Sequence, residues 1–351
     1  MTISGTPSDT RSRVLSWIAL GVVYLVWGST YLAIRVGVGH LPPLFLAGIR
    51  YVIAGALLYP IALRAARSRG TASSHGKASS RGTAEDKVKP DLRAWLAGAV
   101  VGILLLFAGN GGVTIGETTL PSGLAAVLVA TVPLWMIVFA WPMQHQRVTS
   151  RSAAGLAVGL SGVVVLVGYG TSSGSIPGVI IVLGAAAAWG FGSVLSHKLA
   201  LPSYAMLAAA IEMLVGGVVL LVVAAGTGEF SRIHWSAVPA TSWIALAYLI
   251  GPGSILAFSA YGYALSHLPL TTVSTYAYVN PVVAVLAGIV FLGEQFTWHE
   301  GIGATLVLIS VVIILNRSGS ASRQPAVSDD EVREAEALPV DTLPVDALSS
   351  Q

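Results

Sequence analysis

One apolar segment of the sequence carries a stripe of aromatic and polar side chains. Residues three and four apart lie on one face of a helix. The stripe consists of Phe107, Asn110, Thr114 and Glu117. Asn110 and Thr114 could bind a solute there, and Glu117 could titrate or attract cations. The alternative is structural: hydrogen bonds between helices for Asn110 and Thr114, and an ordinary interfacial acid for Glu117.

Aromatic and small polar side chains at related spacings occur in four further apolar segments. They are Trp27, Tyr31, Trp189, Ser193, Phe258, Tyr261 and Tyr278. The tryptophans lie near the middle of their segments, unlike the aromatic belt at a membrane interface. They therefore either line a cavity or pack between helices. With the polar stripe as a second wall, these positions are candidate substrate-binding residues for an amphipathic or aromatic solute.

The composition requires a non-aqueous solvent. Of the 351 residues, 54% are hydrophobic and only 10% are charged. Runs of about twenty apolar residues match the roughly 30 Å hydrocarbon core of a bilayer. Polar groups inside hydrocarbon are costly unless they face a partner or water, so the stripe should point to the protein interior. The basic residues lie between apolar runs rather than on a folded face, which argues against nucleic-acid binding.

We predict an all-α membrane protein with ten transmembrane helices. The expected spans are 14–34, 44–63, 94–115, 121–141, 151–168, 177–196, 204–225, 242–264, 269–291 and 301–316. The first is too long for the apolar region of a secretory signal, and no cleavage site follows before Arg35.

The distribution of Lys and Arg predicts the orientation. With the amino terminus (1–13) inside, sixteen of these residues fall on the cytoplasmic side, and the outer side has Arg35 and Arg232. Both termini are therefore expected in the cytoplasm, with the chain in a plasma (inner) membrane. A basic cytoplasmic loop is predicted at 64–93, and an acidic, disordered tail at 317–351.

The sequence contains an internal repeat. An offset of 162 maps Trp27-Gly28 onto Trp189-Gly190, and an offset of 148 maps Pro133 onto Pro281. The predicted repeats, 14–168 and 177–316, hold five spans each. Because five is odd, the second repeat must lie upside down relative to the first, as in secondary transporters with a site between inverted halves.

Arg50 and Glu212 are the full charges well inside the predicted spans, at equivalent repeat positions. Each lies about seven residues into its span from opposite faces, which places them roughly 9 Å apart in depth. We therefore expect each to be anchored locally, with Arg50 on loop carbonyls and Glu212 on hydroxyls. Proton coupling through Glu212 is an alternative.

Two prolines occupy equivalent positions in the fourth and ninth spans. Pro133 and Pro281 each remove one backbone hydrogen bond and free the carbonyl four residues earlier. We expect hinges at both, the alternative being static kinks that a neighbouring helix satisfies.

Several segments resemble the EamA family of the drug/metabolite transporter superfamily, closest to its YedA-like exporter branch. They are WGSTYLAIR at 27–35, GNGGVTIGE at 109–117, LPSGLAAVLVATVP at 120–133, AAIEMLVGG at 209–217 and YAYVNPVVAVLAG at 276–288. The resemblance implies ten helices in two five-helix repeats around a central cavity. One departure is His145-Gln146, where the second half has Gly293-Glu294. It puts in doubt any role that needs an acid at both positions.

Enzyme motifs are incomplete. Gly159 to Gly162 spells GxSG, which resembles the nucleophile motif of rhomboid proteases, but all seven histidines fall in loops or at span ends. His299-Glu300 begins a zinc-protease motif in which Gly303 replaces the second ligand. We expect no catalytic residues, metal or cofactor, and an intramembrane protease or lipid-modifying enzyme stays a remote alternative.

The sequence thus predicts a secondary transporter for small molecules, working by alternating access. Export of metabolites or organic compounds is implied by the resemblance. Uptake or exchange of amino acids or metabolites is the alternative, and proton coupling is possible in either case through Glu117 or Glu212.

Overall fold

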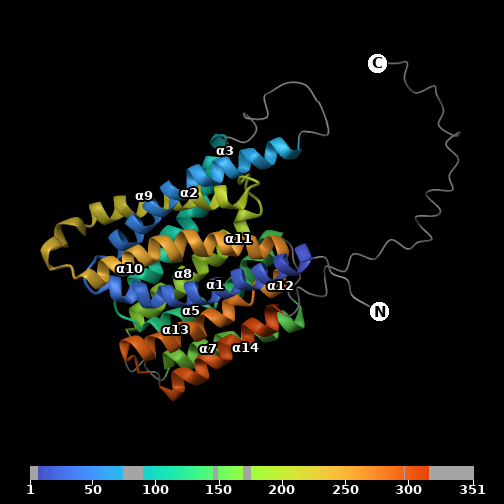
Figure 1. Cartoon of the computed structure of the whole chain (residues 1–351). Coiled ribbons are helices and arrows are strands. Elements are labelled where there is room, and N and C mark those ends of the chain that lie inside the picture. Colours follow the sequence, from blue (N-terminus) through green and yellow to red (C-terminus); the bar gives the residue numbers. More distant parts are fainter. Residues whose placement is uncertain (1–6, 74–89, 145–148, 169–174, 296, 316–351) are drawn as a thin grey trace, which may run out of the picture. The chain divides into compact units, whose positions relative to one another are not determined.

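The computed structural model describes residues 7–73, 90–144, 149–168, 175–295 and 297–315, and every regular element within these ranges is a helix (Figure 1). The predicted tail at 317–351 and residues 74–89 of the predicted basic loop lie outside the described residues. The beginning of that loop is helical, because α2 continues past Arg64 to Ser73.

The first half of the chain contains two long helices followed by shorter helical pieces. The elements are α1 (Pro7–Val38), α2 (Pro43–Ser73), α3 (Leu92–Gly102), the π-helix η2 (Ile103–Gly111), α4 (Gly112–Gly116), α5 (Ser122–Val129), α6 (Val132–Gln144) and α7 (Ser150–Gly168). In α3, η2 and α4 the chain runs on without interruption. Asp91 caps the beginning of α3, where its carboxylate accepts a hydrogen bond from the Ala94 nitrogen at 2.8 Å.

The second half has the same kind of elements. They are α8 (Ile176–Ser196), α9 (Ala205–Gly226), the 3₁₀ turns η3 (Phe230–Arg232) and η4 (Trp235–Ala237), α10 (Ala240–Ile250), the π-helix η5 (Gly251–Leu256), α11 (Ala257–His267), α12 (Leu270–Val273), α13 (Tyr276–Leu292) and α14 (Trp298–Leu315).

Seven helical stretches of the described residues are long and apolar enough to cross a membrane. Three further apolar helices are shorter, at Ser150–Leu166, Tyr276–Leu292 and Trp298–Ile314. The protein is therefore an all-helical, multi-pass membrane protein, whereas the arrangement of ten spans in two inverted repeats stays a prediction.

Glycines allow close helix packing at pairs of sites that mirror one another. α2 lies against α9, and α7 lies against α14, at opposite edges of the bundle (Figure 1). A Cβ atom at Gly55 would lie 2.9 Å from the Leu214 nitrogen, and one at Gly217 would lie 2.8 Å from the Val52 nitrogen. The offset of 162 exchanges these two contacts, since 55 + 162 = 217 and 52 + 162 = 214.

The same reciprocity occurs between other helices. A Cβ atom at Gly28 of α1 would lie 2.6 Å from the Val283 Cβ of α13. One at Gly190 of α8 would lie 2.8 Å from the Trp135 Cβ of α6. Gly190 is Gly28 plus 162, and Val283 is Trp135 plus 148. An internal two-fold relation generates such pairs, because a contact between two residues then implies the contact between their counterparts.

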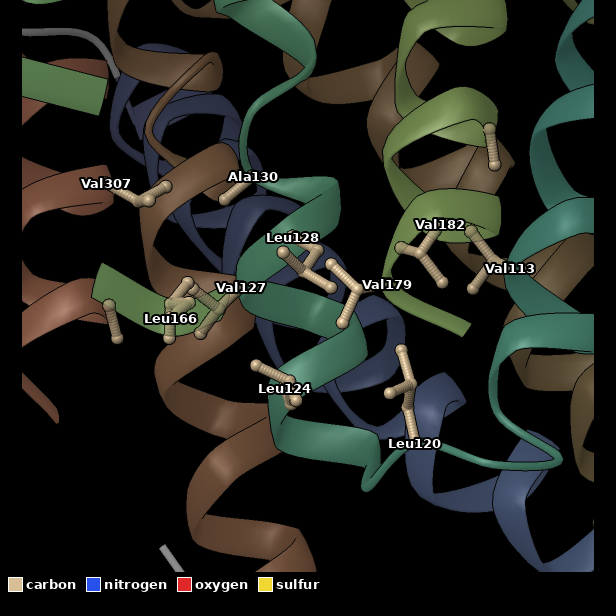
Figure 2. Close-up of a cluster of buried hydrophobic side chains, with 12 residues drawn as sticks. Val113, Leu120, Leu124, Val127, Leu128, Ala130, Leu166, Val179, Val182 and Val307 are labelled. Atoms are coloured by element: carbon tan, nitrogen blue, oxygen red, sulfur yellow. The ribbon is translucent and has the colours of Figure 1, made fainter. Parts of the chain in front are cut away.

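A buried apolar cluster holds α4 and α5 against α8 and the pair α7 and α14. Figure 2 shows Val113 facing Val182, and Leu128 against Val179. Leu120 and Leu128 are fully buried. Loosening the packing of such side chains is costly because it leaves cavities, so this cluster fixes the position of the α4–α5 turn.

Candidate functional site

The polar stripe predicted between residues 107 and 117 begins in a π-helix. η2 and η5 begin at Ile103 and Gly251, which are related by the repeat offset, since 251 − 103 = 148. π-Helical turns are rare and occur often at functional sites. Asn110 lies in η2. Its side-chain amide is half-buried and has no hydrogen-bond partner among the described residues. The Thr114 hydroxyl, in contrast, donates to the Asn110 backbone oxygen at 2.8 Å, within its own helix.

The predicted aromatic residues of α1 and α11 come together. The Trp27 ring lies 5.3 Å from Phe258 and 5.2 Å from Tyr261, measured between ring centroids. Tyr276 of α13 completes the group, 5.2 Å from Trp27 and 5.7 Å from Tyr261. Such edge-to-face contacts stabilise the three helices against each other. The sequence pattern does not single out Tyr276 as a site residue.

Other candidates lie outside this aromatic group. Trp189 packs against η2, where a Cβ atom at Gly109 would lie 2.9 Å from its ring. Phe107 packs on the cluster that also contains Leu106 and Leu220. Tyr31 packs on the cluster of Figure 2. Ser193 and Tyr278 are both partly buried.

The Arg50 side chain, from α2, is hydrogen-bonded to the second π-helix, η5. Its Nε donates to the Ser254 hydroxyl at 2.9 Å, and its guanidinium carbon lies 4.7 Å from the centre of the Tyr51 ring. Ser254 in turn donates to the Leu249 oxygen at 2.9 Å. The partner is therefore a hydroxyl within the bundle rather than the loop carbonyl expected from the sequence. Arg50 and Glu212, both within the described residues, form no ion pair.

Glu117 is more deeply enclosed than an interfacial acid. It follows the span that ends at Gly116, its exposed fraction is 0%, and neither carboxylate oxygen has a hydrogen-bond partner among the described residues. Arg35 donates to the Glu117 backbone oxygen, so its guanidinium does not satisfy the carboxylate. Burial, and next the nearby Glu294 carboxylate, raise the pKa of Glu117 well above its usual value, against the opposing effect of Arg35 and Arg50.

Glu294 links the end of α13 to the beginning of α5. Its Oε1 accepts from the Ser122 nitrogen at 2.8 Å, and its Oε2 accepts from the Ser122 hydroxyl at 2.9 Å and the Gly123 nitrogen at 3.3 Å. A carboxylate at a helix N-terminus accepts hydrogen bonds from the free N–H groups there and interacts favourably with the positive end of the helix dipole. We call these three hydrogen bonds the Glu294 cap.

Two glycines make the Glu294 cap possible. Gly293 ends α13 in the left-handed region at φ 62°, and the Glu294 nitrogen donates back to the Gly288 oxygen at 3.1 Å. This turn directs Glu294 toward α5. A Cβ atom at Gly288 would collide with Glu294 Oε2, so a glycine at 288 leaves the space that the carboxylate occupies. The sequence showed the Gly293-Glu294 pair without its partner, because 172 residues separate Glu294 from Ser122.

The two prolines differ in their surroundings. Pro133 lies in the first turn of α6, directly after the interruption between α5 and α6 at residues 130–131. Pro281 lies inside the continuous α13, and the corresponding interruption falls earlier, between α12 and α13 at residues 274–275. The predicted hinges stay predictions, with Pro133 beside a break and Pro281 within a helix.

The long apolar helical stretches are those of a multi-pass membrane protein. Residues 15–168 and 176–316 both match the EamA-like transporter family. The chain belongs to this family and is a membrane transporter.

Individual relatives agree with this assignment. The chain is 39% identical over 298 residues to the inner membrane transporter YedA of Escherichia coli K12, covering 84% of this chain and 89% of the relative. It is 27% identical to the transporter YvbV of Bacillus subtilis, over 92% of this chain and 97% of that one. A Salmonella typhimurium protein named "Probable amino-acid metabolite efflux pump" is 24% identical, over 86% and 95%.

A solved crystal structure shares the fold. It superposes with a TM-score of 0.54 at 20% identity, covering 89% of this chain and 99% of that chain. This similarity concerns the arrangement of the helices alone.

Proposed function

We propose that the protein is a secondary active transporter that exports small metabolites or amphipathic organic compounds. In this proposal ten transmembrane helices form two inverted five-helix repeats, and a solute is passed between the two membrane faces by alternating access. An uptake or exchange carrier for amino acids or metabolites is the second candidate, since the contacts described above do not depend on the direction of transport.

The reciprocal glycine contacts carry the proposal. Gly55 against Leu214 and Gly217 against Val52 are related by one offset, and each joins the first half of the chain to the second. Such pairs support an internal two-fold axis that relates the halves. With five spans in each half, that axis lies in the membrane plane, which is the arrangement in which transporters bind solutes near the midplane.

The solute class follows from the groups around the two π-helices. The Asn110 amide has free hydrogen-bonding capacity, and the aromatic group of Trp27, Phe258, Tyr261 and Tyr276 offers apolar ring faces and edges. A solute with one polar and one apolar or aromatic part suits both. The residues proposed to line the path are therefore Asn110 and the aromatic side chains of α1, α8 and α11.

Cysteine labelling tests the path and the orientation. The chain has no native cysteine, so single cysteines at 27, 110 and 189 report directly on access. Reaction of these sites with a small water-soluble thiol reagent supports a solvated path, and failure of all three contradicts it. Cysteines at 72 and 172 should react from opposite sides of the membrane in intact cells. Reaction from the same side would contradict the inverted arrangement.

Transport itself is tested with purified protein in proteoliposomes. A panel of amino acids, metabolites and aromatic amphiphiles is screened with and without an imposed pH gradient. For an accepted solute, we expect Asn110→Ala to reduce transport strongly. Ser161→Ala is the matched control, because the Ser161 hydroxyl donates to the Val158 oxygen of its own helix at 2.8 Å. Equal loss of transport in the two variants would contradict a specific role for Asn110.

A further inference from the structure

The Glu117 carboxyl is enclosed without a partner for its charge. Its exposed fraction is 0%, and both oxygens lack hydrogen-bond partners among the described residues. A buried carboxylate without compensating groups is strongly disfavoured, whereas the neutral acid is tolerated far better. The protein therefore encloses a group whose protonated form fits this packing better than its charged form.

The nearby cations are engaged elsewhere. From α1, Arg35 donates to the Glu117 backbone oxygen, and Tyr31 is the other titratable group. From α2, Arg50 donates to Ser254. The other elements packed on α4 are α5, α8 and η2, whose sequences contain no Asp, Glu, His, Lys, Arg or Tyr. Neither arginine therefore donates a hydrogen bond to the Glu117 carboxylate in this closed arrangement.

The nearby anion is fixed in place. Glu294 acts electrostatically on Glu117 and is held on the α5 N-terminus by the Glu294 cap. Two carboxylates close together in a region with little water repel each other when both are charged. Three donors hydrogen-bond to the Glu294 carboxylate whereas none bonds to the Glu117 carboxylate, so we place the proton on Glu117.

We propose that Glu117 is a proton-binding site that couples protons to the opening of one end of the bundle. Glu117 holds a proton while α4, α5 and the end of α13 are packed together, and it releases the proton to water when this end opens. The inference rests on the proposed function, in which this end faces the outside and opens during transport. It adds the coupling ion and the group that binds it.

The direction of the effect follows from linkage. Because the closed arrangement binds the proton more tightly, a low external pH favours closing and a high external pH favours opening. Deprotonation in the closed arrangement leaves a buried, unpaired charge on Glu117 beside the charge of Glu294. Once this end has opened, water solvates the Glu117 carboxylate and screens its repulsion from Glu294. The opening equilibrium changes by about tenfold for each unit by which closing raises the pKa of Glu117.

The test measures opening without any solute. Thr114 is 2% exposed and lies one helical turn from Glu117, so Thr114→Cys provides a reporter that is covered when the end is closed. In proteoliposomes of single orientation, its labelling rate by an external charged thiol reagent is measured at a low and a high external pH, about 5.5 and about 8.5. The readout is the labelling rate at the higher pH divided by the labelling rate at the lower pH.

Matched variants separate this effect from the pH dependence of the thiol itself. Glu117→Gln, which mimics the neutral acid, should lower the ratio by about tenfold or more, to the value set by thiol ionisation alone. Glu117→Asp retains a carboxyl and should restore the larger ratio. Glu300→Gln is the control, because Glu300 is also buried, at 2% exposure, with an unpartnered Oε1, yet lies in the first turn of α14. It should leave the ratio unchanged.

A ratio that Glu117→Gln does not alter, including absence of labelling at both pH values, overturns the inference. The same change in Glu300→Gln as in Glu117→Gln would also overturn it, because the effect would then be unspecific. These outcomes are distinct from failure of the proposed function. If solutes are transported while the ratio is insensitive to Glu117, the transporter stands without this proton site. If the ratio depends on Glu117 but no solute is moved, the transport proposal fails.

Discussion

Replacing Glu294 by alanine should destabilise the junction between α13 and α5. The change removes both acceptor oxygens of the Glu294 cap and leaves three donors without that partner: the Ser122 nitrogen, the Ser122 hydroxyl and the Gly123 nitrogen. Ser122 is fully buried, so its donors cannot easily turn to water. Loss of a helix cap costs about 1 kcal/mol, and an abandoned buried donor adds a cost of similar size.

We therefore expect Glu294→Ala to lower the free energy of unfolding by about 2 kcal/mol. For a chain of this size, the midpoint of thermal unfolding should fall by about 3 °C. Glu294→Gln, which keeps one acceptor oxygen, should lose about half as much free energy. The assay is thermal unfolding of the purified protein in detergent, followed by tryptophan fluorescence.

The neighbouring Gln295 provides the control. Its side chain is exposed, so Gln295→Ala should leave the midpoint unchanged. Gly288→Ala should resemble Glu294→Ala, because the added methyl group takes the position of the carboxylate. If Glu294→Ala unfolds at the same temperature as the parent protein, the cap does not hold these helices together, and the reasoning from its three hydrogen bonds is refuted.

Three further predictions concern the packing of the bundle. Gly55→Ala should lower the free energy of unfolding by about 1–3 kcal/mol, because the new Cβ meets a backbone nitrogen at 2.9 Å. Gly21→Ala is the control and should leave the free energy of unfolding unchanged, because the space around Gly21 is open. Equal unfolding midpoints for the two variants would contradict this prediction. Arg50→Met should be destabilising because it removes the hydrogen bond to Ser254 and the contact with Tyr51. The double variant Arg50→Met, Ser254→Ala should lose less unfolding free energy than the sum of the two single variants. Strict additivity would exclude a direct interaction. Trp27→Ala should lower the free energy of unfolding by about 3–5 kcal/mol, because it removes three ring contacts. Trp27→Phe should retain much of that stability in the same unfolding assay. A fully stable Trp27→Ala would show that the aromatic group is not packed.

The helices themselves were largely predictable from the sequence. Hydrophobic length placed each expected span on helical residues, although the fourth and ninth spans are interrupted at 130–131 and 274–275. A further difference is the end of α2, where the polar residues from Arg64 to Ser73 suggest a loop. Helix propensity and the preceding apolar turns extend the helix there, because polar side chains at the end of a span can stay solvated while the backbone remains helical.

The π-helices could not be predicted in this way. Their side chains are as apolar as those of the flanking α-helices, and a change from i→i+4 to i→i+5 hydrogen bonding leaves little trace in a hydrophobicity pattern. The internal repeat contained a partial signal, because the glycines in GPGS at 251–254 weaken regular α-helix at the equivalent of Ile103.

The substrate-binding role of the candidate residues stays a prediction. Trp27, Phe258 and Tyr261, which are among these candidates, contact one another in the structure. Glu117 was assigned an interfacial position from its place at a span end. Its enclosure results instead from helices packed on α4, such as α1 and α8, which are distant in sequence, and residue spacing within one helix does not report on such neighbours.

The space that Gly288 leaves for Glu294 also constrains how this protein can diverge. An alanine at 288 displaces the Glu294 carboxylate from its position in the cap, and a carboxylate at 294 occupies that position only when residue 288 is a glycine. Among descendants of this sequence, the two positions should therefore change together or in a fixed order, with the substitution at 294 preceding the one at 288.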